Sequence, residues 1–247
     1  MNYLLRKFHL YLFYFLVLFC FLLTYPYLRY LALQPDNNYA KLAAVRKWIS
    51  RNALRIAGIR IQVSYEQAID WSLPYIICPN HSSMLDISIL DAVAKQPCSF
   101  MGKVELLQNP VTKIFFQTID IPVDRANKRS SFKAFKQAES FLNAGRSLVI
   151  FPEGKIDDEY PPRLHPFKKG AFRLAKENNK LLLPVVILNA WEILWDDGKR
   201  FGSRPGIIQV KVLSPIDPAS LQEQAAEDME QMVYSRLKYY WDNHNKS

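Results

Sequence analysis

The sequence predicts an α/β fold in which a largely parallel sheet is covered by helices. Short apolar runs of the kind that form buried or half-buried strands recur along the chain after residue 58. Segments with a helical spacing of apolar residues lie between most of these runs. An alternation of strands and helices is typical of a parallel sheet with helices on both faces.

The expected elements follow one another in a regular order after Gly58, because glycine commonly ends a helix. The expected strands lie at residues 59–63, 75–78, 98–101, 119–123, 147–151, 181–188 and 207–213. The expected helices lie at residues 84–93, 109–116, 130–143, 170–178 and 218–241. A chain of 247 residues has room for one such domain and an anchor, so we divide it into residues 1–58 and 59–247.

The first segment is apolar enough to enter a membrane. Residues 8–28 form a run of 21 residues without a charged side chain. As a helix this run would measure about 32 Å, against roughly 30 Å for the hydrocarbon core of a bilayer. A cleavable signal peptide would have a shorter apolar core that ends at small residues, whereas bulky residues and Arg29 follow here. The pattern therefore favours a retained membrane anchor.

The next segment, residues 39–57, has the pattern of an amphipathic and basic helix. Its expected apolar face carries Leu42, Val45, Ile49, Ala53 and Ile56. Its expected basic face carries Lys47, Arg51 and Arg55. Such a helix either packs on the protein core or lies among lipid headgroups. The two segments then form a spanning helix followed by a surface helix, or a hairpin bent at Pro26 or Pro35 that dips into one leaflet.

The positive charge of the chain is concentrated near its beginning. The formal net charge is +9, and residues 1–65 hold nine Lys and Arg residues but a single acidic one, Asp36. A basic segment beside an apolar one suits an anionic membrane surface. No nucleic-acid-binding motif accompanies this charge and the rest of the chain is close to neutral, so nucleic acid is not expected as a partner.

Cysteine and histidine spacing predicts neither a disulfide framework nor a metal site. Cys20, Cys78 and Cys98 are an odd number without CxxC spacing, and they occur in apolar or strand-like contexts. The four histidines are scattered and form no HExxH motif.

A histidine and an aspartate follow the expected strand at residues 75–78. The chain continues with Pro79-Asn80-His81-Ser82-Ser83-Met84-Leu85-Asp86 and then enters an apolar helix. If His81 lies on the turn before the helix, its ring can fold back to the Asp86 carboxylate. Asp86 would then keep one imidazole nitrogen protonated and leave the other to accept a proton from an alcohol. The alternative is a turn histidine with Asp86 capping the helix or facing solvent.

The two serines beside His81 are better explained as helix caps than as nucleophiles. Serine is a preferred residue at a helix N-terminus, where its side chain accepts a backbone N–H. The chain also contains no G-x-S-x-G nucleophile elbow.

The spacing of Asn80-His81 and Asp86 is similar to the N-H-x4-D motif of the PlsC-type glycerolipid acyltransferases, the lysophosphatidate (1-acylglycerol-3-phosphate) acyltransferase family. Further blocks resemble the same family in the same order, over roughly residues 75–215. With N-H-x4-D as the first block, the second, third and fourth blocks are Ile121-Pro122-Val123-Asp124-Arg125, Phe151-Pro152-Glu153-Gly154 and Leu183-Pro184-Val185-Val186-Ile187. Two segments between them also look like the family, namely Phe100-Met101-Gly102-Lys103-Val104-Glu105-Leu106 and Phe167-Lys168-Lys169-Gly170-Ala171-Phe172. Four ordered blocks are a far more specific signal than one of them alone.

The resemblance, together with the residue types, suggests roles for the side chains of these blocks. His81, Asp86 and Glu153 are the expected catalytic residues, with Glu153 binding acceptor hydroxyls, orienting the site or forming a structural ion pair. The expected substrate-binding residues are Asn80, Lys103, Arg125, Gly154 and Lys155. Lys103 and Arg125 both follow expected strands, so they can converge on a phosphate. Gly154 lets substrate approach the backbone closely.

Two departures from the family pattern concern the acceptor headgroup. The third block of the family commonly continues with threonine and arginine, whereas this chain has Lys155 and Ile156. The headgroup role of that arginine transfers to this chain only if Lys155 takes its place. The second block often carries a glycine shortly before its arginine, and residues 116–120 contain none.

The resemblance implies transfer of a fatty acyl group from acyl-CoA or acyl-carrier protein to the free hydroxyl of 1-acylglycerol 3-phosphate, which gives phosphatidate. No metal or other cofactor is expected, because a thioester is already activated. The expected partners are the lysophospholipid acceptor, the acyl donor and membrane lipids, at the bacterial inner membrane with a cytoplasmic active site. Three alternatives remain, namely an acyltransferase for another lysolipid headgroup, a membrane-bound lipid or thioester hydrolase and a non-catalytic lipid-binding protein.

Overall fold

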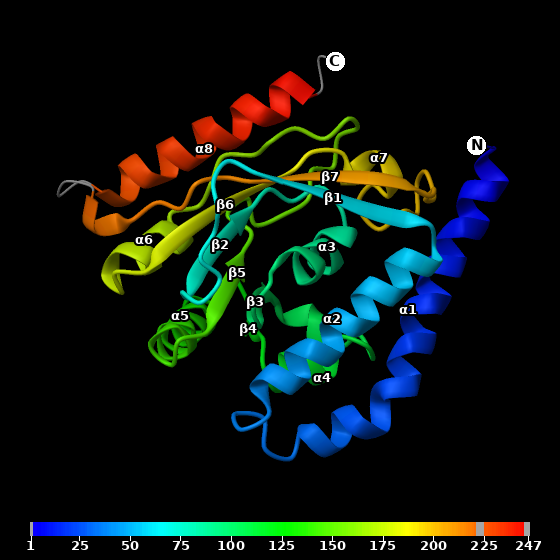
Figure 1. Ribbon diagram of the computed structural model, residues 1–247, viewed down its shortest axis with the longest axis horizontal. Coiled ribbons are helices and arrows are strands. Elements are labelled where there is room, and N and C mark those ends of the chain that lie inside the picture. Colours follow the sequence, from blue (N-terminus) through cyan, green and yellow to red (C-terminus); the bar gives the residue numbers. More distant parts are fainter. Residues whose placement is uncertain (1, 221–224, 245–247) are drawn as a thin grey trace.

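The protein is a seven-stranded sheet covered by helices, as a computed structural model of residues 2–220 and 225–244 shows (Figure 1). The strand order is β1-β7-β6-β2-β5-β3-β4. The strands are β1 (Ile59–Tyr65), β2 (Tyr75–Pro79), β3 (Cys98–Lys103), β4 (Ile121–Val123), β5 (Ser147–Ile150), β6 (Leu181–Ile187) and β7 (Gly206–Val212). All neighbouring strands are parallel except β6 and β7, which are antiparallel. The predicted α/β class with a largely parallel sheet is thus confirmed.

Eight α-helices accompany the sheet in the part of the chain that the structure describes. They are α1 (Tyr3–Leu31), α2 (Tyr39–Ile56), α3 (Leu85–Val93), α4 (Lys113–Phe116), α5 (Lys128–Asn143), α6 (Gly170–Glu177), α7 (Ala190–Ile193) and α8 (Ala225–His244). Two 3₁₀ turns, η1 (Val104–Leu107) and η2 (Pro218–Ser220), complete the order. The last predicted helix, residues 218–241, begins as η2, and residues 221–224 of that prediction lie outside the described residues.

One predicted helix and one predicted strand are shorter than expected. The helix predicted at residues 109–116 begins only at Lys113, because the Asn109 side chain accepts the backbone N–H groups of Val111 and Thr112 and holds a turn there. The strand predicted at residues 119–123 begins at Ile121, because the Asp120 side chain bonds to the backbone N–H of Phe100 at 2.8 Å.

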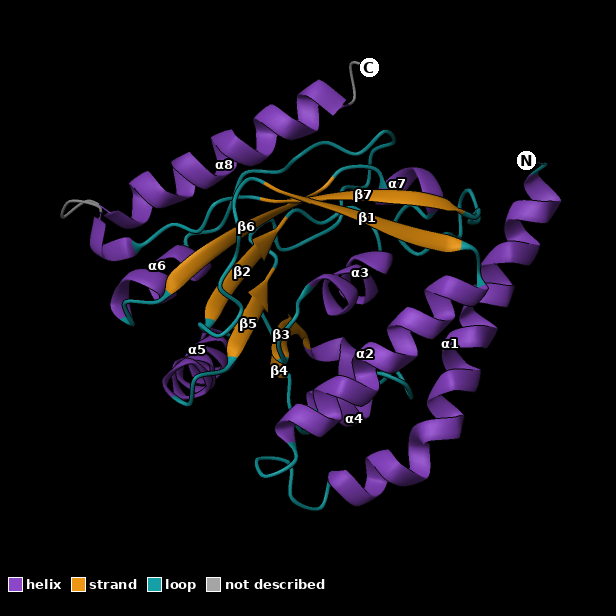
Figure 2. Cartoon of the chain, viewed as in Figure 1, coloured by secondary structure: helices purple, strands orange, loops and turns teal. Residues whose placement is uncertain are grey.

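The helices form two layers, one on each face of the sheet (Figure 2). Helices α1, α2, α3 and α7 contribute to the apolar core on one face, and α5, α6 and α8 to the core on the other. Strand β2 serves both layers, because side chains of successive strand residues point to opposite faces. Tyr75 and Ile77 lie in the first core, and Ile76 and Cys78 lie in the second. This central, doubly covered strand positions the segment that contains His81.

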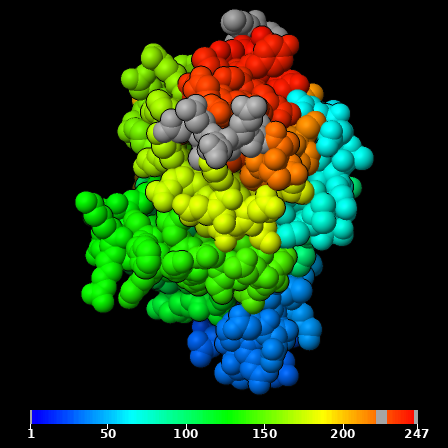
Figure 3. Space-filling view, turned by 90° about the vertical axis from the view of Figure 1, so that its left-hand side faces the viewer, coloured from blue at the N-terminus to red at the C-terminus, as the bar shows by residue number. Residues whose placement is uncertain are grey.

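Helix α1 is buried along one side and exposed along the other. Leu10, Phe13 and Leu16 belong to the core beneath the sheet, whereas Phe8 and Phe15 are 68% and 60% exposed. The helix continues through Pro26, and the chain reverses in the segment that contains Pro35 (Figure 1). Viewed from the side of α5, α6 and α8, the blue segment that leads from α1 into α2 extends below the rest of the molecule (Figure 3).

Among the described residues, α1 is the one helix that is long and apolar enough to cross a membrane by length and composition. The core helix of a soluble protein and a signal sequence have the same properties, so this observation indicates membrane association only weakly.

Helix α2 is amphipathic as predicted, but its buried face is rotated relative to the prediction. Leu42, Ile49 and Ala53 are buried, whereas Ile56 is 59% exposed and Arg46 is only 6% exposed. Ile56 was expected on the apolar face, and that expectation is wrong. The buried face includes Arg46 because its side chain points inward and pairs with buried acidic groups. Ile56 lies in the last turn of the helix and is not on this buried face.

The buried Arg46 side chain connects α2 to the sheet domain. Its guanidinium donates to Asp91 of α3 at 3.0 Å, to both oxygens of Asp120 at 2.6 and 2.7 Å, and to the carbonyl oxygen of Cys98 at 2.6 Å. Burial raises the pKa of the Asp91 and Asp120 carboxyls, and the Arg46 charge opposes that rise. The three side chains therefore stabilise one another, and removal of one would leave buried charge unpaired.

Candidate active site

The site is built at the end of β2, where the chain turns into α3. Asn80 is the first residue after the strand and is 1% exposed. Its side chain donates to the carbonyl oxygen of Ile187 at 3.0 Å and accepts the Ile187 N–H at 2.7 Å. Both ends of this amide bond to Ile187 of β6, so the observed contacts of Asn80 are structural, and its expected role in substrate binding stays a prediction. Asn80 holds the end of β2 against β6 and so fixes the start of the turn.

His81 and Asp86 form a hydrogen-bonded pair. The His81 Nδ1 lies 2.9 Å from Oδ2 of Asp86, a side chain that is fully buried. A carboxylate only accepts hydrogen bonds, so Nδ1 carries the proton and Nε2 is left as the basic nitrogen. The imidazole also stacks on the Phe151 ring, with the ring centroids 4.1 Å apart. The ring is thereby held in one orientation at the edge of a cavity.

Asp86, the second residue of α3, also holds the turn that leads into this helix. Its Oδ2 accepts the backbone N–H groups of Ser82 and Ser83 at 2.8 and 2.9 Å. The Ser83 hydroxyl accepts the N–H of Leu85 at 3.0 Å, which is the capping role expected for a serine at this place. One oxygen of Asp86 therefore fixes the backbone of the turn and the tautomer of His81 together.

Glu153 lies beneath the turn and holds its backbone. One carboxylate oxygen accepts the His81 N–H at 2.6 Å, and the other accepts the His165 N–H at 2.8 Å. Burial raises the pKa of Glu153 to about 8, although the two backbone hydrogen bonds oppose the rise. The side chain is 4% exposed and uses both oxygens on backbone amides. Its contacts fit the orienting role among the alternatives, so we describe Glu153 as a positioning residue.

A cavity of about 460 Å³ opens beside His81 and brings four predicted substrate-binding residues together. Lys103, Arg125, Gly154 and Lys155 all line this cavity. Lys103 ends β3 and Arg125 follows β4, two adjacent parallel strands, so the sheet brings these cations to one edge. Lys155 lies 3.4 Å from Asp158, and both side chains are exposed.

Arg125 and Gly154 are in direct contact. The Arg125 guanidinium donates to the carbonyl oxygen of Gly154, and burial lowers the pKa of Arg125. Gly154 has a positive φ of 75°, and a side chain there would lie 3.1 Å from the Arg125 guanidinium and 2.9 Å from Nζ of Lys168. Lys168 thus lies beside the cations of the cavity. We did not assign it a role from the sequence, although it belongs to a block that carries the family resemblance.

Most of the remaining lining of the cavity is apolar and was not predicted, and two acidic residues, Asp158 and Asp196, also line it. The apolar part is formed mainly by Met84, Ile87, Phe100, Met101, Leu106, Phe116, Phe151 and Ile156. A cavity with basic groups on one wall and apolar groups on the other suits a molecule with an anionic head and a hydrocarbon tail. Among the described residues there is no group of three or more His, Cys, Asp or Glu side chains that could hold a metal ion.

Comparisons with known proteins show the family of the chain. The family model described as Acyltransferase matches residues 60–188, so the chain belongs to the acyltransferase family. It is 27% identical over 217 residues to the 1-acyl-sn-glycerol-3-phosphate acyltransferase of Cocos nucifera, which covers 87% of this chain and 65% of the relative. It is 28% identical over 176 residues to the human 1-acyl-sn-glycerol-3-phosphate acyltransferase beta, which covers 70% of this chain and 62% of the relative. The matched regions span about half to two thirds of the length of such relatives.

A solved structure shares the fold over nearly the whole chain. The crystal structure of the 1-acyl-sn-glycerophosphate (LPA) acyltransferase PlsC from Thermotoga maritima superposes with a TM-score of 0.79 over 98% of both chains, at 18% sequence identity. This likeness includes the N-terminal helices as well as the sheet domain.

Proposed function

We propose that this protein transfers a fatty acyl group from a thioester donor to the free hydroxyl of 1-acylglycerol 3-phosphate and so forms phosphatidate. The observation that carries the proposal is the His81–Asp86 pair at the edge of a cavity that combines three basic side chains with an apolar wall. The relatives named above are 1-acyl-sn-glycerol-3-phosphate acyltransferases, which supports the same acceptor.

The geometry provides a general base for the acceptor hydroxyl. Within the described residues, Nε2 of His81 makes no hydrogen bond, and it can accept the hydroxyl proton as the oxygen attacks the thioester carbonyl. The Asp86 charge stabilises the imidazolium that forms. The new carbon–oxygen bond replaces the carbon–sulfur bond, and the proton passes from Nε2 to the leaving sulfur. The Ser83 hydroxyl is occupied as a helix cap, whereas the Ser82 hydroxyl is buried and makes no hydrogen bond among the described residues, so the capping expected of both serines is seen for Ser83 alone. In the step above the acceptor oxygen attacks the thioester directly, so no acyl-enzyme forms.

The acceptor phosphate would bind at the basic wall. Arg125 and Lys103 lie at the ends of adjacent strands. Lys155 follows Gly154 in the chain, and the Lys168 side chain lies beside Gly154. Arginine offers a planar fork of N–H donors and lysine a point charge, a combination suited to a phosphate monoester. The acyl chain of the lysolipid or of the donor would lie against the apolar wall.

The exposed side of α1 would contact the membrane that holds the acceptor and product. Large apolar side chains such as Leu4, Phe8, Phe15 and Leu22 are more than half exposed there, while the other side of α1 packs on the protein. This distribution favours a helix that lies along a bilayer surface over one that spans it. We place the protein at the bacterial inner membrane with the active site on the cytoplasmic side.

The test is a panel of acceptors with one labelled acyl-CoA and one labelled acyl-carrier protein. The panel contains lysophosphatidate, glycerol 3-phosphate, lysophosphatidylcholine, lysophosphatidylinositol and an amino-acid-derived lysolipid. We expect lysophosphatidate to be used fastest. If another lysolipid is used about ten times faster, the acceptor is wrong while the chemistry stands. Release of free fatty acid without any acceptor would indicate a hydrolase, and no turnover at all would indicate a lipid-binding protein.

A further inference from the structure

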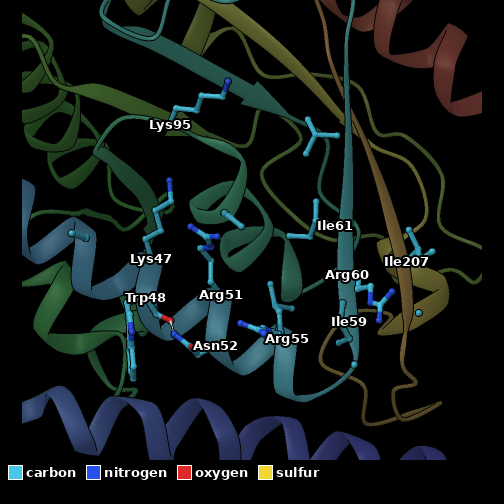
Figure 4. Close-up of a pocket in the computed structure, with 16 residues that line it drawn as sticks. Lys47, Trp48, Arg51, Asn52, Arg55, Ile59, Arg60, Ile61, Lys95 and Ile207 are labelled. Atoms are coloured by element: carbon cyan, nitrogen blue, oxygen red, sulfur yellow. Dashed lines mark hydrogen bonds between the residues drawn. The ribbon is translucent and has the colours of Figure 1, made fainter.

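A second hollow lies on the same face of the sheet as α2 and α3, apart from the cavity at His81. It has a volume of about 1160 Å³ and is bordered by α2, the C-terminal end of α3 and the beginnings of β1 and β7 (Figure 4). None of its 16 lining residues is acidic, whereas five are basic. These five residues are Lys47, Arg51, Arg55, Arg60 and Lys95. We call this feature the basic hollow.

The charges of the basic hollow are not neutralised within the described part of the chain. The side chains of Arg51, Arg55 and Arg60 are exposed and make no hydrogen bond or ion pair there. Lys47 donates to the carbonyl oxygen of Ala94 at 2.6 Å, and Lys95 lies 5.7 Å from the centre of the Tyr65 ring. Burial and the neighbouring Arg51 charge lower the pKa of Lys47. An anionic partner would relieve this repulsion between like charges.

The arrangement of the cations fits the acidic face of another protein. Lys47, Arg51 and Arg55 follow one another at intervals of four residues, so they form a row along α2 with a repeat of about 6 Å. Carboxylates at the same interval on a partner helix would form a matching row. Ile61 and Val63 of β1 supply a partly apolar floor between the row and Arg60. A concave surface of this kind receives a convex partner better than it receives a flat bilayer.

Helix α3 connects the basic hollow to the catalytic cavity. Ile87, near its beginning, lines the catalytic cavity, and Ala92, near its end, lines the basic hollow. The nine residues of α3 span about 13 Å. A phosphopantetheine arm is about as long as five extended residues, or roughly 17 Å. Such an arm, attached to a protein in the basic hollow, is long enough to reach past α3 toward His81.

We propose that the basic hollow docks an acidic acyl-carrier protein, whose phosphopantetheine arm then brings the acyl thioester to His81. This inference rests on the proposed function, which requires a thioester donor, and it names the donor's carrier. The nucleotide end of acyl-CoA and an anionic bilayer are the competing occupants, and each predicts a different result below.

The test compares two charge-reversal variants of the full-length protein. Arg51→Glu combined with Arg55→Glu changes the hollow. Arg29→Glu combined with Lys41→Glu is the matched control, because both residues are exposed, lie outside the hollow and give the same change in net charge. Binding of fluorescently labelled holo-acyl-carrier protein is measured by anisotropy in phosphatidylcholine nanodiscs, at low and at high salt. The rates with acyl-carrier protein and with acyl-CoA as donors are measured in parallel.

We expect the hollow variant to bind the carrier protein at least about tenfold more weakly than the control variant does, with wild-type binding weakened by salt. The ratio of kcat/KM for acyl-carrier protein to kcat/KM for acyl-CoA should fall by a similar factor in the hollow variant alone. Equal losses in both variants, or no carrier binding by wild type, would overturn the proposal. An equal rise in KM for acyl-CoA would assign the hollow to its nucleotide.

Sedimentation with phosphatidylglycerol vesicles separates the bilayer from the carrier protein. If the hollow variant loses vesicle binding more than the control does, while it retains the carrier protein, the hollow contacts the bilayer and the proposal is wrong. If the carrier protein binds as expected but wild type transfers acyl groups from neither donor, docking stands and the proposed function fails.

Discussion

Replacement of Asp86 by asparagine separates the charge of this side chain from its hydrogen bonds. Three groups donate to Oδ2, namely the His81 ring and the backbone N–H groups of Ser82 and Ser83. The other oxygen, Oδ1, is buried and has no hydrogen-bond partner among the described residues. An asparagine with its oxygen at the Oδ2 position would keep all three hydrogen bonds and would place its NH₂ group where no partner exists. The turn should therefore persist while the negative charge is lost.

The magnitude follows from the interaction between Asp86 and the imidazolium formed during the reaction. Two unit charges about 4 Å apart interact by about 4 kcal/mol at an effective dielectric constant of about 20. At 1.36 kcal/mol for each factor of ten, this loss corresponds to a decrease in kcat of about 10³-fold. Asp86→Ala would remove the three hydrogen bonds as well, so we expect that variant to be less stable and not only slower.

The assay is the initial rate of transfer from labelled acyl-CoA to lysophosphatidate, with thermal unfolding measured on the same preparations. We expect Asp86→Asn to unfold cooperatively and to show a much reduced kcat with little change in KM. A folded Asp86→Asn protein with a kcat within about twofold of wild type would refute the reasoning, because the predicted charge effect is far larger. A variant that fails to fold would instead show that the NH₂ group cannot be accommodated, and Asp86→Glu would then test the charge.

Three further predictions concern the base, the phosphate and the buried glutamate. His81→Ala should lower kcat by about 10²–10⁴-fold, and more than a few per cent residual activity in folded protein would contradict the general-base role. Arg125→Ala and Lys103→Ala should each raise KM for lysophosphatidate by roughly ten- to a hundredfold, as steady-state kinetics with a neutral-headgroup acceptor as the control can show. Because the folded-state pKa of Glu153 is about 8, above its ordinary value of 4.5, its contribution to stability is present below that ordinary value and is lost as pH rises through 8. Urea unfolding should therefore show wild type losing up to about 5 kcal/mol relative to Glu153→Gln over this range, whereas parallel pH curves would argue against a buried, protonated carboxyl.

Membrane contact is tested best on the exposed side of α1. Deletion of residues 1–35 would remove Leu10, Phe13 and Leu16 from the core and unfold part of the domain. Exchange of Phe8 and Phe15 for serine leaves that core intact, because both side chains are exposed. We expect much of this double variant to remain unbound in a vesicle flotation assay. Flotation equal to that of wild type would contradict membrane contact through the exposed side of α1.

The sheet and most of its helices are predictable because each strand carries a local apolar signal. The buried strand at residues 75–78 and the strand at residues 147–151 consist of contiguous apolar or small residues, and both fall within a residue of the observed ends. The helix predicted at residues 109–116 is longer than the observed one, because the Asn109 side chain accepts two backbone N–H groups at its expected start. Such competition between a side chain and helix formation depends on geometry that periodicity does not contain.

The candidate site was predictable only as far as its motifs reach. The pairing of His81 with Asp86 follows from their spacing across a helix start, but Asn80 illustrates the limit. Its neighbour in the motif is catalytic in our proposal, whereas Asn80 itself bonds to Ile187, which is 107 residues away in the sequence. The apolar wall of the cavity has no sequence motif, because its residues come from four separate segments that only the folded sheet assembles.

Arg46 shows most clearly what a sequence pattern cannot express. In a list of residues it is one more positive charge on a basic helix, and its two acidic partners lie at positions 91 and 120. Nothing local marks it as buried, since arginine is rarely buried unless it is paired. Only the packing of α2 against α3 makes the inward position favourable.

The same guanidinium fixes the position of α3, which carries Asp86, relative to the hairpin formed by α1 and α2. If α2 shifted along its axis by one turn, Arg46 would no longer pair with the buried carboxyl groups of Asp91 and Asp120. The loss of these pairs would cost several kcal/mol. Helix α3 carries Asp91 near one end and Asp86 at the other. The distance and orientation of the His81 ring relative to any surface that contacts the exposed side of α1 are therefore set by this fixed hairpin.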